Sequence, residues 1–292
     1  MFVTRLLSGI VLMIIAALTF FFGTPYLTVL LAVISVIAYR ELANMLELSG
    51  RSPGEASATP GAPKKNLGNR PGAAESVGYA AIIAYYCVLQ LSDLKLLQKE
   101  TFVCLMAVVA FFFLAELFVY VFTFPKYHAE QIAGAVFSFL YAPVMLSFID
   151  MTRAQEDGKF LVWLILICSW GCDTCAYCVG MLIGKKKIFP VLSPKKSLEG
   201  CIGGILGAAL LGGLFVRFAM GKELREVLIL ALICAFGAVA SMVGDLAASA
   251  IKRNKDIKDY GKLIPGHGGI MDRFDSVIVT APMVYFLSVL LL

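Results

Sequence analysis

The chain has 292 residues, of which 60% are hydrophobic and only 15% are charged. Soluble domains carry about 25% charged residues, so this composition excludes an ordinary soluble enzyme and predicts an all-α, polytopic integral membrane protein. The net charge of +5 comes from basic residues that lie in loops between apolar runs. This distribution is typical of membrane proteins and excludes nucleic acid as the expected partner.

Apolar runs of roughly 17 to 25 residues predict about nine transmembrane helices. They span residues 6–22, 27–46, 77–91, 102–124, 132–149, 160–183, 201–220, 227–251 and 277–292. The first run is interpreted as a retained helix, with a cleaved signal segment as the alternative. The third and ninth runs are short enough to lie tilted in a membrane interface.

The basic residues are distributed unevenly across the predicted membrane. Of the 25 Lys and Arg residues, 18 fall on the side of the N-terminus. The positive-inside pattern therefore predicts a cytoplasmic N-terminus and a cytoplasmic location for the charged stretch 249–276. We expect a protein of a bacterial-type plasma (inner) membrane whose site faces the cytoplasm.

Three segments are expected from composition. Residues 1–48 form an N-terminal transmembrane hairpin, residues 49–76 a flexible cytoplasmic linker, and residues 77–292 the catalytic transmembrane domain. The linker is rich in Gly, Pro, Ala and Ser and has no apolar periodicity, so it cannot bury enough surface to become ordered. A regulatory or partner-binding role for it stays open.

All eight cysteines fall within apolar runs or at their ends, which predicts packing residues rather than a disulfide framework. Four of them, from Cys168 to Cys178, follow the pattern C-x3-C-x2-C-x2-C. On a continuous helix this spacing fans the thiols around the axis, so a zinc or iron–sulfur site is disfavoured.

Three acidic residues lie inside predicted spans, where burial of a carboxylate is costly and usually functional. Glu116 has few polar neighbours, and it is either a functional group or a buried structural one. Asp173 is followed one turn later by Tyr177 on the same helix face. Asp245 begins a polar face that continues through Ser249 and Lys252 towards the charged stretch.

A lysine-rich segment follows the sixth predicted helix. Residues 184–200 contain five lysines together with Ser193 and Ser197, at the start of the next helix. Ammonium groups and the free N–H groups of a helix N-terminus suit a phosphate-bearing polyanion. Anchoring to anionic lipid headgroups explains the lysines equally well, so both interpretations stay open.

The charged stretch adds carboxylates at the start of the last helix. Asp272 and Asp275 are three residues apart and can point the same way. With Asp245 they could hold a hard divalent cation through oxygen ligands. His267 lies in a glycine-rich loop, where it could donate to a phosphate or cap the loop.

At these residues the chain resembles a known family. From Ser249 to Asp275 it reads S-x-I-K-R-x4-K-D-x-G-x2-I-P-G-H-G-G-x2-D-R-F-D. This pattern closely resembles the signature of the phosphatidate cytidylyltransferases, also called CDP-diacylglycerol synthases. The stretches D-T-x-A-Y-x2-G from Asp173 and S-P-K-K-x2-E-G from Ser193 are also similar to that family. Cys175 replaces a usual glycine, and Ser197-Leu198 replaces a usual Thr-Trp.

The resemblance implies an enzyme that transfers CMP from CTP to phosphatidate, giving CDP-diacylglycerol and pyrophosphate in phospholipid biosynthesis. It implies Mg²⁺ as cofactor, with K⁺ as a second cation that can share the site, and a homodimer. The expected catalytic residues are Asp245, Lys252, Asp272 and Asp275, with Asp245, Asp272 and Asp275 as metal ligands. The expected substrate-binding residues are Asp173, Tyr177, Ser193, Lys195, Lys196, Ser249, Arg253, His267 and Arg273.

Two alternatives stay open. A cytidylyltransferase or kinase acting on an ether or polyprenyl lipid would use the same metal and lysine chemistry. An ion-coupled transporter would also carry intramembrane carboxylates, although no paired inverted halves are visible in the sequence.

Overall fold

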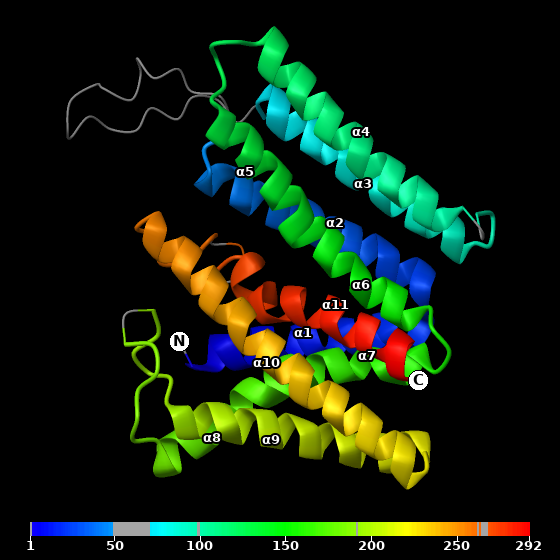
Figure 1. Cartoon of the computed structure of the whole chain (residues 1–292), viewed down its shortest axis with the longest axis vertical. Helices are drawn as coiled ribbons and strands as arrows, with labels where there is room; N and C mark the ends of the chain where they lie inside the picture. Colours follow the sequence, from blue (N-terminus) through cyan, green and yellow to red (C-terminus); the bar gives the residue numbers. More distant parts are fainter. Residues whose placement is uncertain (1, 49–70, 98–99, 191, 262, 264–267) are drawn as a thin grey trace. The chain divides into compact units, whose positions relative to one another are not determined.

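The computed structural model describes residues 2–48, 71–97, 100–190, 192–261, 263 and 268–292. These residues form helices joined by loops and contain no β-strand (Figure 1). The elements are α1 (Phe2–Phe22), α2 (Thr24–Met45), α3 (Ala73–Asp93), α4 (Thr101–Phe122), α5 (Ala129–Phe139), η2 (Leu140–Val144), α6 (Met145–Arg153), α7 (Gly158–Leu166), η3 (Ile167–Gly171), α8 (Cys172–Ile183), α9 (Leu198–Phe215), η4 (Val216–Met220), α10 (Leu224–Asn254) and α11 (Met271–Leu291).

The membrane spans confirm the predicted all-α membrane fold. Within the described residues, eight helical segments are long and apolar enough to cross a membrane, and a shorter apolar segment, Met13–Phe22, lies in α1. They coincide one for one with the nine predicted runs. The third and ninth runs were predicted too short. Both α3 and α11 have 21 residues, because each helix begins with polar residues that a search for apolar runs leaves out.

Three spans contain a turn of π-helix. In two of them, η2 and η3 join consecutive α-helices into one continuous span, and η4 ends the span that begins with α9. The turn η2 contains Pro143, which has no backbone N–H to donate to a regular helix. The turn η3 ends directly before α8, and π-turns are frequent next to functional residues.

Contacts divide the chain into two compact units. Unit 1 comprises Met1–Leu27 and Met145–Leu292, and unit 2 comprises Thr28–Val144. The three segments expected from the sequence were defined by their composition and expected function, whereas these units are defined by contacts. The three-segment division therefore stays a prediction. Of the expected linker, residues 49–70 lie outside the described part of the chain, and residues 73–76 belong to α3.

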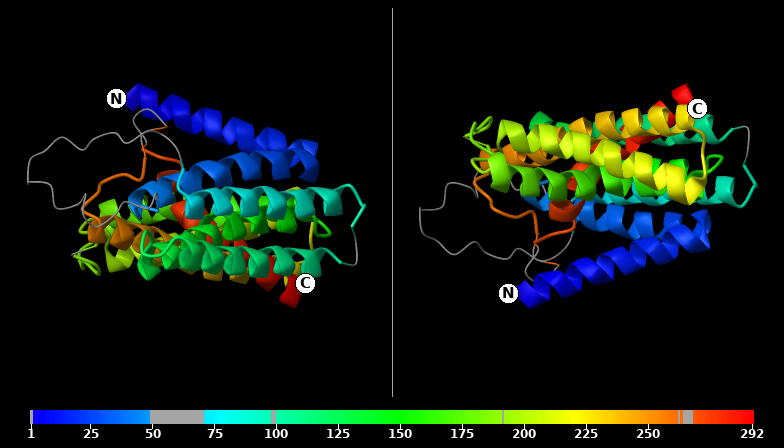
Figure 2. Two further views of the ribbon diagram at one scale, coloured as in Figure 1. Left: turned by 90° about the horizontal axis from the view of Figure 1, so that it is seen from above. Right: turned by 90° about the horizontal axis from the view of Figure 1, so that it is seen from below.

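In unit 1, α9 packs against both α8 and α10, and α10 packs against α11 (Figure 2). Glycines make these contacts close. A Cβ atom at Gly204 would lie 3.0 Å from the carbonyl oxygen of Cys172 on α8 and 2.9 Å from Met242 on α10. A Cβ atom at Gly244 would lie 2.7 Å from the carbonyl oxygen of Asp275. The start of α11 therefore lies directly against α10.

In unit 2, α3 packs against α4 and α5 around buried aromatic side chains. Phe112 and Phe139 are in contact, with ring centroids 4.4 Å apart and ring planes tilted by 39°. Tyr86 shares a hydrogen bond of 2.8 Å with Ser35 and donates one of 3.0 Å to the carbonyl of Pro143. Glu116 on α4 is fully buried in this unit.

Candidate active site

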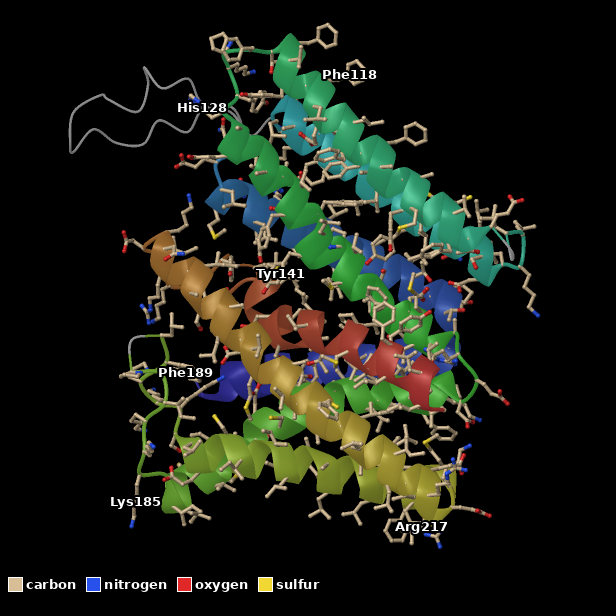
Figure 3. The ribbon with its side chains drawn as sticks, viewed as in Figure 1. Phe118, His128, Tyr141, Lys185, Phe189 and Arg217 are labelled. Atoms are coloured by element: carbon tan, nitrogen blue, oxygen red, sulfur yellow. The ribbon has the colours of Figure 1, made fainter. Side chains whose placement is uncertain are left out.

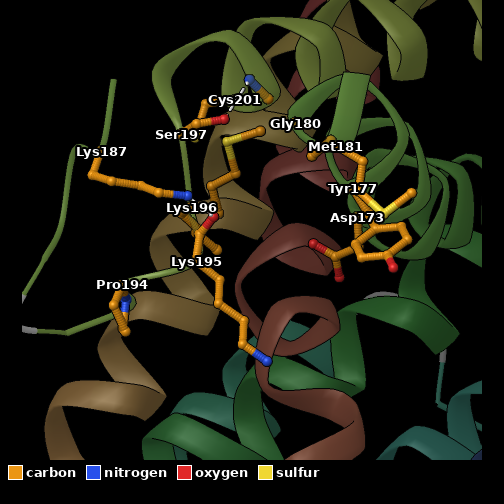
Figure 4. Close-up of a pocket in the computed structure, with 13 residues that line it drawn as sticks. Asp173, Tyr177, Gly180, Met181, Lys187, Pro194, Lys195, Lys196, Ser197 and Cys201 are labelled. Atoms are coloured by element: carbon orange, nitrogen blue, oxygen red, sulfur yellow. Dashed lines mark hydrogen bonds between the residues drawn. The ribbon is translucent and has the colours of Figure 1, made fainter. Parts of the chain in front are cut away.

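A pocket with a volume of about 420 Å³ lies along α8 in unit 1. Figure 4 shows Asp173 and Tyr177 of α8 on one side, and residues of the lysine-rich loop on the other. The full lining comprises Asp173, Ala176, Tyr177, Gly180, Met181, Lys187, Pro194, Lys195, Lys196, Ser197, Gly200, Cys201 and Met242. Residues of the two motifs that begin at Asp173 and Ser193 therefore share one cavity.

Backbone hydrogen bonds hold the lysine-rich loop in place. Lys187 and Ser197 form an isolated antiparallel bridge, and the N–H of Leu198 donates to the carbonyl of Lys186 at 2.8 Å. The hydroxyl of Ser197 accepts a hydrogen bond of 3.2 Å from the N–H of Gly200, so Ser197 is the N-cap of α9. The usual Thr of the family motif is therefore replaced by a residue that caps the helix.

The loop also reaches α10 through an ion pair. The Nζ of Lys196 lies 2.6 Å from Oδ2 of Asp245, and the two side chains are 21% and 32% exposed. The carboxylates of Asp173, Asp245 and Asp275 are close enough to repel one another. Lys196 thus places an ammonium group beside carboxyl groups from three different helices.

Asp272 has a separate environment, three residues before Asp275. Its Oδ1 lies 2.9 Å from the Nζ of Lys252, and the side chains are 4% and 16% exposed. Its Oδ2 accepts hydrogen bonds from the N–H groups of Tyr260, at 2.8 Å, and Gly269, at 2.9 Å. A Cβ atom at Gly268, where φ is +86°, would lie 2.7 Å from that oxygen. Asp272 therefore ties the loop before α11 to α10.

The remaining predicted residues make fewer contacts that indicate a role. Ser193 and Lys195 lie in the loop, where the carbonyl of Lys195 accepts a hydrogen bond of 3.0 Å from the Nζ of Lys187. Ser249 and Arg273 are half-buried on α10 and α11, and Arg253 is exposed near the end of α10. Of the predicted site residues, Asp173, Tyr177, Lys195 and Lys196 line the pocket. Ser193, Asp245, Ser249, Lys252, Arg253, Asp272, Arg273 and Asp275 are not part of its lining. His267 lies outside the described residues.

The predicted metal ligands differ in how well they suit a cation. Asp245 and Asp275 supply the hard oxygen atoms that Mg²⁺ prefers, and a bound cation would relieve their repulsion. Asp272 does not fit, because Lys252 and two backbone amides already engage both of its oxygens. In the described parts of the chain, no three His, Cys, Asp or Glu side chains form a ready-made metal site.

The eight cysteines are all free thiols. Cys168, Cys172 and Cys234 are buried between helices of unit 1, whereas Cys178 is exposed. The thiols at successive positions along η3 and α8 therefore have different surroundings, as the helical spacing predicts.

Several residues of the site were missed from the sequence. Lys187 lines the pocket, but it was counted only as one of five lysines. Tyr260 occupies a variable position of the family signature, yet its ring lies 5.3 Å from the Nζ of Lys252 and its hydroxyl donates to the carbonyl of Ala248 at 3.0 Å. Glu199 belongs to a motif that was recognised, without a role assigned to it.

The fold and site define a helical membrane protein with a pocket lined by three lysines and the Asp173 carboxylate, and with Asp245 paired to one of those lysines. The family model described as the cytidylyltransferase family matches residues 3–291. The chain therefore belongs to the cytidylyltransferase family, which confirms the resemblance found in the sequence.

Individual relatives share part of the chain. The phosphatidate cytidylyltransferase of Bacillus subtilis is 40% identical over 143 residues, which are 49% of this chain and 52% of the relative. That of Synechocystis is 40% identical over 137 residues, 46% of this chain and 45% of the relative. That of Haemophilus influenzae is 37% identical over 133 residues, 45% of this chain and 46% of the relative. The alignments thus span about half the length of these relatives.

Proposed function

We propose that the protein transfers CMP from CTP to phosphatidate and releases pyrophosphate. A phosphate oxygen of phosphatidate attacks the α-phosphorus of CTP, and the bond from that phosphorus to the bridging oxygen of the β-phosphate breaks. The observation that carries this proposal is the pocket itself, where Lys187, Lys195 and Lys196 meet the Asp173 carboxylate. Membership of the cytidylyltransferase family and the names of the relatives support the choice of nucleotide and lipid.

The residues suit a reaction between two polyanions. The attacking phosphate is already anionic near neutral pH, so it needs no strong general base. The main barrier is charge repulsion, which positioned ammonium groups reduce. Lys196 forms an ion pair with Asp245 and also lines the pocket. It is therefore placed to exchange Asp245 for a substrate phosphate.

Asp245 and Asp275 would hold Mg²⁺, with K⁺ as a second cation. Mg²⁺ bound there would neutralise phosphate charge and make the α-phosphorus more electrophilic. Asp272 would act indirectly, since its ion pair with Lys252 fixes that ammonium group near the start of α11. Contacts of Ser193, Ser249, Arg253, His267 and Arg273 with substrate rest on the family resemblance.

The lipid would enter from the bilayer. Tyr177 and Met181 line the pocket and are 67% and 68% exposed on α8, which suits acyl chains that stay in hydrocarbon. We propose that this end of the helices faces the cytoplasm in a bacterial-type inner membrane, because most basic residues lie on that predicted side. A homodimer is proposed from the resemblance alone, and the mass of the detergent-solubilised complex tests it.

Incubation of the purified protein with CTP labelled in its α-phosphate, Mg²⁺ and phosphatidate tests the function. We expect label in a chloroform-soluble product and unlabelled pyrophosphate in the aqueous phase. Transfer to an ether-lipid or polyprenyl phosphate, but not to phosphatidate, would contradict the substrate and keep the reaction. A parallel incubation with CTP labelled in its γ-phosphate tests for a lipid kinase, because only transfer of the γ-phosphate would then put label into the lipid.

A further inference from the structure

Glu199 connects α9 to the first part of the lysine-rich loop. Its Oε2 accepts hydrogen bonds from the backbone N–H groups of Lys185, at 3.0 Å, and Lys186, at 3.2 Å. Its Oε1 accepts a second, longer one of 3.3 Å from the N–H of Lys186. One carboxylate therefore holds two consecutive peptide groups that lie about 14 residues earlier in the chain.

These bonds fix the loop at its base. Next to them, the N–H of Leu198 donates to the carbonyl of Lys186, and Lys187 bridges Ser197. The following side chain, Lys187, lines the pocket and donates to the carbonyl of Lys195. Release of Lys185 and Lys186 from Glu199 would therefore loosen the segment that presents Lys187 and Lys195 to the cavity.

A simpler explanation for Glu199 is its place in the first turn of α9, where a carboxylate interacts favourably with the helix dipole. The dipole does not require contact with a second segment, however, and Ser197 already caps this helix. Figure 3 shows Lys185 at one end of the α8–α9 pair and Arg217 at the other, so Glu199 acts at the lysine-bearing end. Glu130 holds the same second position in α5 and is exposed, which provides a matched control.

We propose that Glu199 is a positioning residue for the phosphate-binding lysines. Its carboxylate holds the backbone of Lys185 and Lys186 at the start of α9 through hydrogen bonds. The loop lysines therefore face the pocket before a phosphate ligand binds. This role rests on the proposed function, because it assigns the pocket lysines to a substrate phosphate. The phosphate belongs either to the nucleotide or to the lipid, and the kinetic experiment distinguishes the two.

The kinetic experiment compares Glu199→Ala with Glu130→Ala in detergent–lipid micelles. We expect Glu199→Ala to raise the KM of one substrate about tenfold, as loss of hydrogen bonds to a charged group can do, with a smaller change in kcat. A higher KM for CTP assigns the lysines to the nucleotide, and a higher KM for phosphatidate assigns them to the lipid. Glu130→Ala should leave both values unchanged. Equal effects in the two variants would reduce Glu199 to a helix-dipole residue and overturn the proposal.

Limited trypsin digestion tests whether Glu199 holds the loop in place, and it does not depend on enzymatic activity. In Glu199→Ala we expect faster cleavage after Lys185, Lys186 or Lys187 than in the wild type, with no change in Glu130→Ala. If Glu199→Ala does not fold, Glu199→Gln takes its place, because it keeps the shape and loses one acceptor oxygen. Wild-type KM values and wild-type trypsin protection in the folded variant would refute the role. An inactive wild type would refute the proposed function, while the digestion would still decide whether Glu199 holds the loop.

Discussion

Asp245 and Asp272 of unit 1 and Glu116 of unit 2 are acidic residues of membrane helices with different surroundings. In unit 1, Asp245 and Asp272 each pair with a lysine from another segment, and Asp245 remains 32% exposed. In unit 2, Glu116 is fully buried, and neither of its oxygens has a hydrogen-bond partner among the described residues. Of these three groups, only the partly exposed Asp245 can exchange its partner without a rearrangement of the protein, because Asp272 and Glu116 are both enclosed. Asp245 is therefore accessible for the role proposed for it, and the structure of unit 2 gives Glu116 no comparable access.

A second contrast lies within unit 1, between two acids on one helix. Asp272 is buried and uses both oxygens in contacts within the protein. Asp275 is half-buried, and Asp245 and Asp173 lie close enough to repel it. We therefore expect the first acid to determine stability and the second to determine activity.

The largest effect is expected from the carboxylates near the pocket. Asp245→Asn and Asp275→Asn should each lower kcat by a factor on the order of 10² to 10³, since each removes a charge that organises the reacting phosphates. Label transfer from CTP to lipid measures this, with size-exclusion chromatography to verify folding. Glu116→Gln in unit 2 is the control and should stay active. A fully active Asp275→Asn variant would remove that residue from the site.

Asp272→Asn should mainly destabilise the protein. Loss of one partner of a buried ion pair costs about 3–5 kcal/mol, because Lys252 would keep a charge without its carboxylate. Thermal unfolding in detergent should show a lower Tm for this variant than for Asp275→Asn. If the two variants melt together and only Asp272→Asn is inactive, the distinction between the two acids is wrong.

Lys196→Met should weaken substrate binding by about tenfold, which is typical for the loss of a charged hydrogen bond. The KM for CTP and the KM for phosphatidate are measured separately. Lys159→Met provides the control, because Lys159 is an exposed lysine on α7 and does not line the pocket. Unchanged values in Lys196→Met would mean that this ammonium group only neutralises Asp245.

The smallest effect is expected in unit 2. Glu116→Leu removes a buried polar group that has no hydrogen-bond partner in the part of the chain that the structure describes, so it should change the free energy of unfolding by no more than about 1 kcal/mol or increase it. Activity should stay at the wild-type level. A large loss of activity in this variant would break the contrast between the units and make Glu116 a functional residue.

Much of the fold could be predicted because length and apolarity alone define membrane helices. The predicted runs miss only the polar ends, such as residues 73–76 of α3 and Asp272 of α11. Periodicity placed Asp245, Ser249 and Lys252 on one helix correctly, since it needs only local geometry.

The contacts across loops could not be predicted. Lys196 meets Asp245 from 49 residues away, and no local pattern encodes such a pairing. The spacing predicted that Asp272 and Asp275 belong to one metal site. In the structure, the backbone N–H groups of Tyr260 and Gly269 donate hydrogen bonds to Asp272 instead. Hydrogen bonds to main-chain groups cannot be predicted from the residue types at those positions. The contacts of Glu199 with the backbone were missed for the same reason.

The close contact between α8 and α9 has a consequence for mutational tolerance. Gly200, Gly204 and Gly207 face α8, where an added methyl group would meet Ala176, Cys172 or Cys175. Leu206 and Leu210, on another face of α9, are 65% and 63% exposed. In a saturation scan of α9, the tolerated substitutions should therefore follow the helical periodicity. Positions that face α8 should accept only glycine, and positions on the exposed face should accept most apolar residues. Gly200 also lines the pocket, so a Gly200→Ala change would act on the pocket from within the helix pair.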